Sequence, residues 1–185
     1  MITGSFRCGA ALILAMGAAS PAAAAVVDVA QNGFQVRETA EIAAAPERVY
    51  AALVEPSRWW SSTHTFSGRS ANLTLDARPG GCFCEKLANG GAVQHELIVL
   101  AMPGKELRLR GALGPLQAQG VEGAMSFRLA ASGGGTEVTL TYALGGYMPE
   151  GFADWSKKTD AVLAEQLVRL KRLIETASPD AKTDG

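Results

Sequence analysis

Residues 155–174, WSKKTDAVLAEQLVRLKRLI, decide the fold that we predict for this chain. Apolar side chains recur in this stretch at intervals of three and four residues, the spacing that places them on one face of an α-helix. That face comprises Trp155, Thr159, Val162, Leu163, Gln166, Leu167, Leu170, Leu173 and Ile174. Lysines and arginines populate the opposite face, and the helix is expected to end before Pro179. The stretch therefore predicts a long amphipathic helix that needs an apolar surface to cover.

That surface is predicted in residues 73–147, where short strands alternate with turns. Glycine and proline mark the turns, at residues 79–81, 89–91, 103–104, 114–115 and 133–135. Between the turns apolar and polar residues alternate; Met125 and Phe127, for example, flank Ser126. Alternation with a period of two gives each strand one apolar face, as in an antiparallel sheet that is covered on one side.

Further elements are predicted ahead of this sheet. Alternation in residues 34–43 indicates a first strand. Pro46 is placed to begin a short helix, because proline suits the first helical turn, and a second short helix carries Trp60. The predicted fold class is therefore α+β: a curved antiparallel sheet of about six or seven strands wraps around the long C-terminal helix, with two short helices after the first strand.

Residues 1–25 have the pattern of an export signal. Arg7 precedes an apolar stretch from Cys8 to about Ala19, and a run of small residues follows. This order is typical of a secretory signal peptide, and the apolar stretch is shorter than a membrane-spanning helix. We expect a periplasmic or secreted protein with no stable membrane insertion after cleavage. The mature chain is expected to have a flexible lead-in at 26–33, one domain at 34–178 and a disordered tail at 179–185.

Composition narrows the range of functions. Among 185 residues, 17 lysines and arginines stand against 18 aspartates and glutamates, so the formal net charge is −1. A surface so close to neutral lacks the basic patch that nucleic-acid binding requires, and we expect no nucleic-acid partner. The sequence has neither a Gly-x-Ser-x-Gly elbow nor a glycine-rich phosphate loop, and we expect no cofactor. It identifies no protein partner.

Several segments together resemble one superfamily. They are APERVYAAL at 45–53 with RWW at 58–60, PGGCFCE at 79–85, PGKELRL at 103–109 and GGTEVTL at 134–140. In order and spacing they are similar to the START-like, or SRPBCC, proteins, which include the birch-pollen-allergen fold, polyketide cyclases and the C-terminal domain of the activator of heat-shock-protein ATPase. The resemblance covers Phe34 to about Ala177. It implies a helix-grip fold whose internal cavity, between sheet and C-terminal helix, takes small hydrophobic molecules.

Such a cavity would be lined from both the sheet and the helix. We expect apolar surface from Leu107, Leu109, Met125, Phe127, Leu140 and Tyr142 on the sheet, and from Leu163 and Leu167 on the helix. Trp60 is expected to edge the mouth, because two adjacent tryptophans cannot both point into the core. Glu85 and His95 would orient a polar end of the ligand.

The surroundings of His95 depend on the register of the predicted hairpin. His95 and Leu97 are two residues apart, so their side chains lie on the same face of the predicted strand. If that face is the apolar inner one, His95 points into the interior. With residues 88–91 as a symmetrical loop, Cys84 faces His95; with one residue more or fewer in the loop, Glu85 faces it instead.

The two registers predict different chemistry. The first would gather Cys82, Cys84 and His95 on one face as a metal site, although the cysteine spacing lacks the usual two-residue gap. The second would form a Glu85–His95 pair that could transfer a proton, which makes these two residues the candidates for catalysis. Because cysteines two apart in a strand do not converge, we expect free thiols and no bound metal.

Three functions are compatible with these residues. The leading hypothesis is an exported binding protein for a small hydrophobic molecule, such as a lipid, an aromatic or a polyketide-like compound. The second is a cyclase- or dehydratase-type enzyme in which His95 or Glu85 acts as a general base in the same cavity. The third, an ATPase activator, follows from the family resemblance alone and conflicts with export from the cytosol, where ATP is available.

Overall fold

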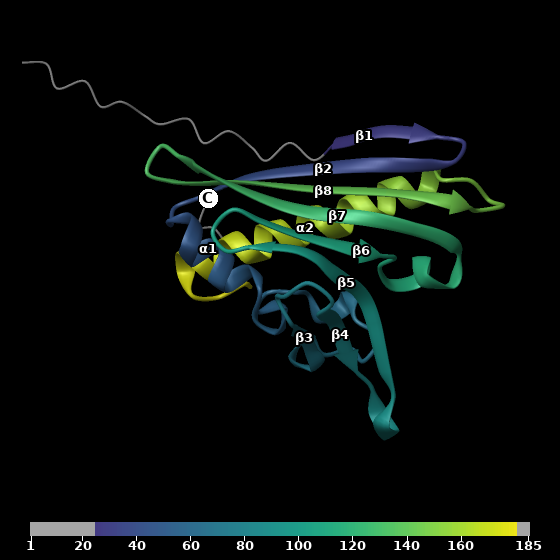
Figure 1. The fold of residues 1–185 in the computed structure, drawn as a ribbon, viewed down its shortest axis with the longest axis horizontal. Coiled ribbons are helices and arrows are strands. Elements are labelled where there is room, and N and C mark those ends of the chain that lie inside the picture. The colour runs from purple at the N-terminus through teal and green to yellow at the C-terminus, as the bar shows by residue number, and fades with distance from the viewer. Residues whose placement is uncertain (1–24, 181–185) are drawn as a thin grey trace, which may run out of the picture.

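A computed structural model describes residues 25–180 of the chain, and Figure 1 shows a sheet that curves around one long helix. All neighbouring strands are antiparallel, in the order β1-β2-β8-β7-β6-β5-β4-β3. The strands are β1 (Ala25–Ala30), β2 (Gly33–Ile42), β3 (Leu73–Leu75), β4 (Cys82–Lys86), β5 (Ala92–Met102), β6 (Glu106–Gly111), β7 (Gly120–Ser132) and β8 (Gly135–Tyr147). The long helix is α2 (Ala153–Thr176). The predicted α+β helix-grip fold is confirmed.

The sheet has eight strands, whereas about six or seven were expected. One of the additional strands is β1, at the edge of the sheet. Residues 26–33, predicted as a flexible lead-in, form most of β1 and the turn into β2. Val26 pairs with Val36 and Val29 pairs with Phe34. The free edge of β2 offers unpaired backbone groups, and β1 satisfies them. In the structure this segment is therefore a paired edge strand of the sheet.

The helices after β2 are shorter and more numerous than predicted. Helix α1 (Pro46–Leu53) begins at Pro46 as expected and buries Val49, Tyr50 and Leu53. The single second helix is replaced by three 3-10 turns, namely η1 (Pro56–Arg58), η2 (Ser62–His64) and η3 (Ser70–Asn72). These turns lead the chain from the end of α1 to β3.

The two predicted terminal segments lie largely outside the described residues. The proposed signal peptide, residues 1–25, ends where the description begins, and the tail beyond Asp180 is not described either. Pro179 and Asp180 form a turn, and Asp180 Oδ1 accepts a hydrogen bond from Arg169 Nη1 at 2.5 Å. Between residues 25 and 180, no helix is both long and apolar enough to cross a bilayer.

The core lies between the concave face of the sheet and the apolar face of α2. Val36 on β2, Leu140 on β8 and Leu163 on α2 are at most 1% exposed. Each fully buried leucine or valine of this kind stabilises the fold by about 1.5–3 kcal/mol. Along the central strands the side chains fill the space directly beneath the helix, so α2 is held to the sheet by continuous apolar contact.

One polar pair interrupts this apolar interface. Glu38 on β2 is 2% exposed and faces Asp160 on α2. Burial raises the pKa of Glu38 to about 8, and both the hydrogen bond with Asp160 and its negative charge add to this increase. Glu38 Oε1 and Asp160 Oδ1 have no hydrogen-bond partner among the described residues. Glu38 is therefore protonated at neutral pH and can donate a hydrogen bond to Asp160.

Replacing Glu38 with glutamine is expected to reduce the loss of stability at alkaline pH. In the unfolded chain Glu38 ionises above its ordinary pKa of 4.5, but in the folded protein it stays protonated up to about 8, so stability falls as pH rises between these values. The upper limit of this loss is about 5 kcal/mol. Urea unfolding at pH 5 and pH 9 should show a smaller decrease for Glu38→Gln than for the natural protein. The exposed Glu137→Gln is the matched control, and equal decreases in all three proteins would contradict the protonated state of Glu38 in the folded protein.

Candidate functional site

A β-bulge in β5 determines which side chains enter the interior. Cys82 pairs with Leu97 and Phe83 with Glu96, but Cys84 then pairs with Gln94, so His95 has no partner on β4. An extra residue of this kind lets two successive side chains point to the same side. His95 and Glu96 are accordingly both buried, at 6% and 0% exposure.

Neither of the two predicted registers occurs, although each was partly right. The symmetrical register correctly paired Cys82 with Leu97, but Cys84 does not face His95. Beyond the bulge the parity is reversed, and Leu97 is 38% exposed instead of facing inward. The bulge nevertheless brings His95 within hydrogen-bond distance of Glu85, the contact that the alternative register was expected to provide.

Glu85 is the acceptor at the centre of a buried hydrogen-bond network. Its carboxylate is 1% exposed and accepts hydrogen bonds from the backbone N–H groups of Phe66 at 3.1 Å and Ser67 at 2.5 Å. His95 Nε2 lies 3.0 Å from Glu85 Oε2. Since an ionised carboxylate can only accept, His95 carries its proton on Nε2, and Nδ1 is left as a hydrogen-bond acceptor.

Opposing effects fix the charges of this pair. Burial alone would raise the pKa of Glu85, but hydrogen bonds from Ser67, Phe66 and His95 outweigh it and lower the pKa. Burial lowers the pKa of His95 more than Glu85 raises it. At neutral pH the site therefore holds an ionised glutamate and a neutral histidine.

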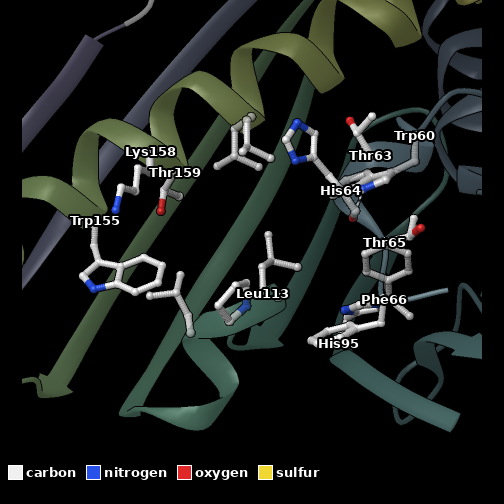
Figure 2. A pocket seen from close by; sticks show the side chains of 16 residues that line it. Trp60, Thr63, His64, Thr65, Phe66, His95, Leu113, Trp155, Lys158 and Thr159 are labelled. Carbon is white, nitrogen blue, oxygen red and sulfur yellow. Dashed lines mark hydrogen bonds between the residues drawn. The ribbon is translucent and has the colours of Figure 1, made fainter. Parts of the chain in front are cut away.

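A pocket of about 360 Å³ is lined in part by His95, and Figure 2 shows this pocket from close by. It is enclosed by the N-terminal half of α2, the loop after α1, the β4–β5 hairpin and the 3-10 turn η5 (Gly114–Ala118). Its lining residues are Trp60, Thr63, His64, Thr65, Phe66, Phe83, His95, Leu113, Gly114, Pro115, Leu116, Trp155, Lys158, Thr159, Val162 and Leu163. Aromatic rings form one wall: the ring of Phe83 lies 5.4 Å from Trp60 and 5.0 Å from His95, centroid to centroid.

The loop that covers the pocket is anchored to both layers of the fold. On the helix side, Gln166 Oε1 accepts a hydrogen bond from Ser61 N at 2.7 Å, and His64 Nε2 lies 3.0 Å from Glu165 Oε2. On the sheet side, Glu85 accepts the two backbone bonds described above. Glu85 therefore lies behind the lining and acts as a positioning residue, because it holds both the loop and the ring of His95.

Apart from Glu85, which lies behind the lining, the structure places the predicted ligand-binding residues in two groups. Trp60, His95 and Leu163 line the pocket. The others pack in the solid part of the core: Leu107, Leu109, Met125, Phe127, Leu140, Tyr142 and Leu167. Four of these border a second void of only about 10 Å³, at the limit of room for one water molecule. Tyr142 has an indirect role, since its hydroxyl accepts a hydrogen bond from Leu113 N at 3.2 Å and so holds the η5 wall.

The cysteines depart from the prediction of free thiols. Cys82 and Cys84 form a disulfide, and their Cα atoms are 5.4 Å apart instead of about 6.5 Å as in a regular strand. The bulge opposite them in β5 accompanies this local shortening of β4. The disulfide lies on the outer face of β4, whereas Phe83 and Glu85 point inward. A metal site formed by Cys82, Cys84 and His95 is therefore not assembled, and no cluster of three metal-binding side chains exists within residues 25–180.

Sequence reasoning missed several residues of the site. Phe66 and the threonines lie in a loop without periodicity, so the sequence contained no indication of their position. Trp155 and Thr159 were assigned to the inner face of the helix but not to a pocket. Glu96 was missed because the bulge reverses its parity. Its two carboxyl oxygens have no partner among the described residues, and burial raises its pKa well above the ordinary value.

The sequence and the fold both have known counterparts. Residues 33–175 match the family described as polyketide cyclase / dehydrase and lipid transport. A conserved protein of unknown function from Enterococcus faecalis has a similar structure, with a TM-score of 0.58 and 18% identity over 83% of this chain and 77% of that one. A protein of the dynemicin biosynthetic locus has a TM-score of 0.56 and 18% identity, over 80% of this chain and 49% of that one.

A third similar structure is the Aha1 dimer from Colwellia psychrerythraea. Its TM-score is 0.52 at 21% identity, and the match covers 77% of this chain and 96% of that one. At these identities the three structures support the fold alone. Comparison with curated proteins found no match.

Glu85→Gln is expected to destabilise the protein at neutral pH. The amide cannot accept all three hydrogen bonds without placing its own NH₂ group against a donor, at a cost of about 2–4 kcal/mol. Because the pKa of Glu85 is lowered on folding, its contribution is complete above pH 4.5 and is lost as pH falls through the lowered value. Urea unfolding at pH 7 and pH 3 should therefore show a difference that shrinks in acid. The exposed Glu122→Gln is the control; a pH-independent difference would contradict the proposed charge state of Glu85.

Removal of the disulfide is expected to have a small effect. A bridge that closes so short a loop restricts the unfolded chain little, and the double variant Cys82→Ser with Cys84→Ser should lose less than about 2 kcal/mol. Before reduction neither cysteine should react with a maleimide in the denatured protein, and after reduction both should. Labelling of both without reductant would contradict the disulfide.

Proposed function

The chain belongs to the polyketide cyclase / dehydrase and lipid transport family, and from that premise we propose that it is an exported protein that binds a small, largely apolar molecule in the pocket beside α2. The observation that carries the proposal is the pocket of about 360 Å³, which is lined mainly by apolar and aromatic side chains and contains a few fixed polar groups. That combination is typical of small-molecule sites.

The size of the pocket favours a compact ligand. Small-molecule pockets range from about 300 to 1,000 Å³, so this one is near the lower end. The solid packing along the rest of α2 leaves no continuation into which a long acyl chain could extend. Aromatic side chains on one wall favour a ring system, which can stack on Trp60, Phe66 or Phe83. We therefore propose an aromatic or polyketide-like guest over a long-chain lipid.

Export is supported by two independent features. The first is the composition of residues 1–25, which has the order of a secretory signal peptide. The second is the Cys82–Cys84 disulfide, because disulfides persist mainly in oxidising compartments such as the periplasm. A periplasmic or secreted location agrees with both.

An enzyme of cyclase or dehydratase type is the second candidate. The observation in its favour is the buried Glu85–His95 pair, in which Glu85 fixes the histidine tautomer and the neutral ring retains an acceptor at Nδ1. A neutral histidine held in this way can act as a general base. In that case His95→Ala would abolish turnover of a bound substrate while the substrate still binds; a pure binding protein would catalyse no turnover in either form.

Filling the pocket is expected to abolish ligand binding. Val162 on α2 faces the pocket, whereas the neighbouring Ala161 is exposed to solvent. The neutral fluorophore N-phenyl-1-naphthylamine should bind the natural protein, and Val162→Trp should raise its Kd at least about tenfold, or about 1.4 kcal/mol. Ala161→Trp adds the same ring outside the pocket and should leave the Kd unchanged. Equal Kd values for the two variants would place binding elsewhere and would sink the proposal.

The identity of the natural ligand can be tested on protein from its own host. Native mass spectrometry before and after organic extraction should show a mass that extraction removes. Since the pocket is compact, that mass should correspond to one small ring-containing molecule per chain.

A further inference from the structure

We infer that the guest of this pocket is an anion, an aromatic or alicyclic carboxylate whose charged group pairs with Lys158 at the rim and whose other end carries a hydrogen-bond donor for His95. This inference rests on the proposed function and names the class of ligand. It follows from the distribution of charge around the pocket.

No negatively charged side chain lines the pocket. Its sixteen lining residues include no aspartate and no glutamate, and Lys158 is the lysine among them. Lys158 forms no ion pair within residues 25–180, and its ammonium nitrogen lies 5.3 Å from the centre of the Trp155 ring. The aromatic contact keeps the ammonium group beside the pocket, where it can attract an anion.

The two histidines in the lining do not offer a competing anion site. His64 is already paired with Glu165, its Nε2 lying 3.0 Å from Glu165 Oε2. His95 is neutral, and the ionised Glu85 lies 3.0 Å behind it. An anion next to His95 would meet the Nδ1 lone pair and the negative field of Glu85. A carboxylate at this end of the pocket is therefore repelled.

The two ends of the pocket differ in the groups that they offer to a ligand. Figure 2 shows Lys158 and Trp155 on one side of the pocket, and His95 and Phe66 on the other. His95 Nδ1 can accept a hydrogen bond from a hydroxyl or an N–H group, but it cannot donate one while Nε2 holds the proton. A bound molecule thus has its anionic end at the helix and its donor end at the hairpin, with an apolar body between them.

Three isosteric probes test the preference for an anion. 2-Naphthoate, the neutral 2-naphthalenemethanol and the cation 2-naphthylmethylammonium are compared as competitors of N-phenyl-1-naphthylamine at pH 7.5 and low salt. The carboxylate should bind about three- to fivefold more tightly than the alcohol, as expected for a partly exposed ion pair, and the cation most weakly. Raising the salt concentration to 0.5 M should reduce this difference, because salt screens exposed charges.

Paired variants assign the preference to one residue. Lys158→Met should remove the preference, so that 2-naphthoate and the alcohol bind with equal affinity. Lys157→Met removes the same charge from an adjacent exposed position outside the lining, and it should keep the preference for the carboxylate. Equal binding of carboxylate and alcohol by the natural protein, or loss of the preference in Lys157→Met, would overturn the inference while the proposed function stands. Failure of all three probes and of the reporter to bind would overturn both.

Discussion

The contact between α2 and the concave face of the sheet is the constraint on which the rest of this structure depends. A 24-residue helix with one apolar face must cover that face completely, and a curved antiparallel sheet supplies the complementary surface. Beneath the central strands the covering is complete, with Leu107, Leu140 and Leu170 at most 1% exposed. Space for a guest can remain only where the sheet departs from the helix, and it does so at the β4–β5 hairpin.

The bulge in β5 links that departure to the chemistry of the site. One extra residue reverses the alternation of side chains along the strand, so His95 and Glu96 both point inward. After the bulge, Leu97 and Val99 point outward. The same irregularity lies opposite the shortened stretch of β4 that carries the disulfide. Glu85 then accepts its bonds from the covering loop and from His95. The wall of the pocket and its polar group therefore have one structural origin.

The sequence predicted those parts of the fold that follow a period. The three- and four-residue spacing located α2 to within two residues at each end, and two-residue alternation located β2, β6, β7 and β8. Glu38 has the same parity as Phe34 and Val36 on β2, but it was not predicted as a buried residue, and its pairing with Asp160 depends on the position of the helix. The hairpin register could not be predicted, because one inserted residue reverses every later side chain. The loop of residues 61–67 has no period, so the location of the pocket at one end escaped prediction.

The polar contacts around the pocket indicate why a hollow is retained there. Gln166, Glu165 and Glu85 hold the covering loop from behind, so its backbone groups are satisfied without using the space inside. In the solid half of the core, apolar packing performs the same task of fixing the sheet to the helix. Any movement of the loop into the hollow that displaced residues 66 and 67 would break their two backbone bonds to Glu85 and leave the buried carboxylate with His95 as its remaining donor. Loss of hydrogen bonds to a buried carboxylate is costly, so these bonds oppose a collapse of the loop into the hollow.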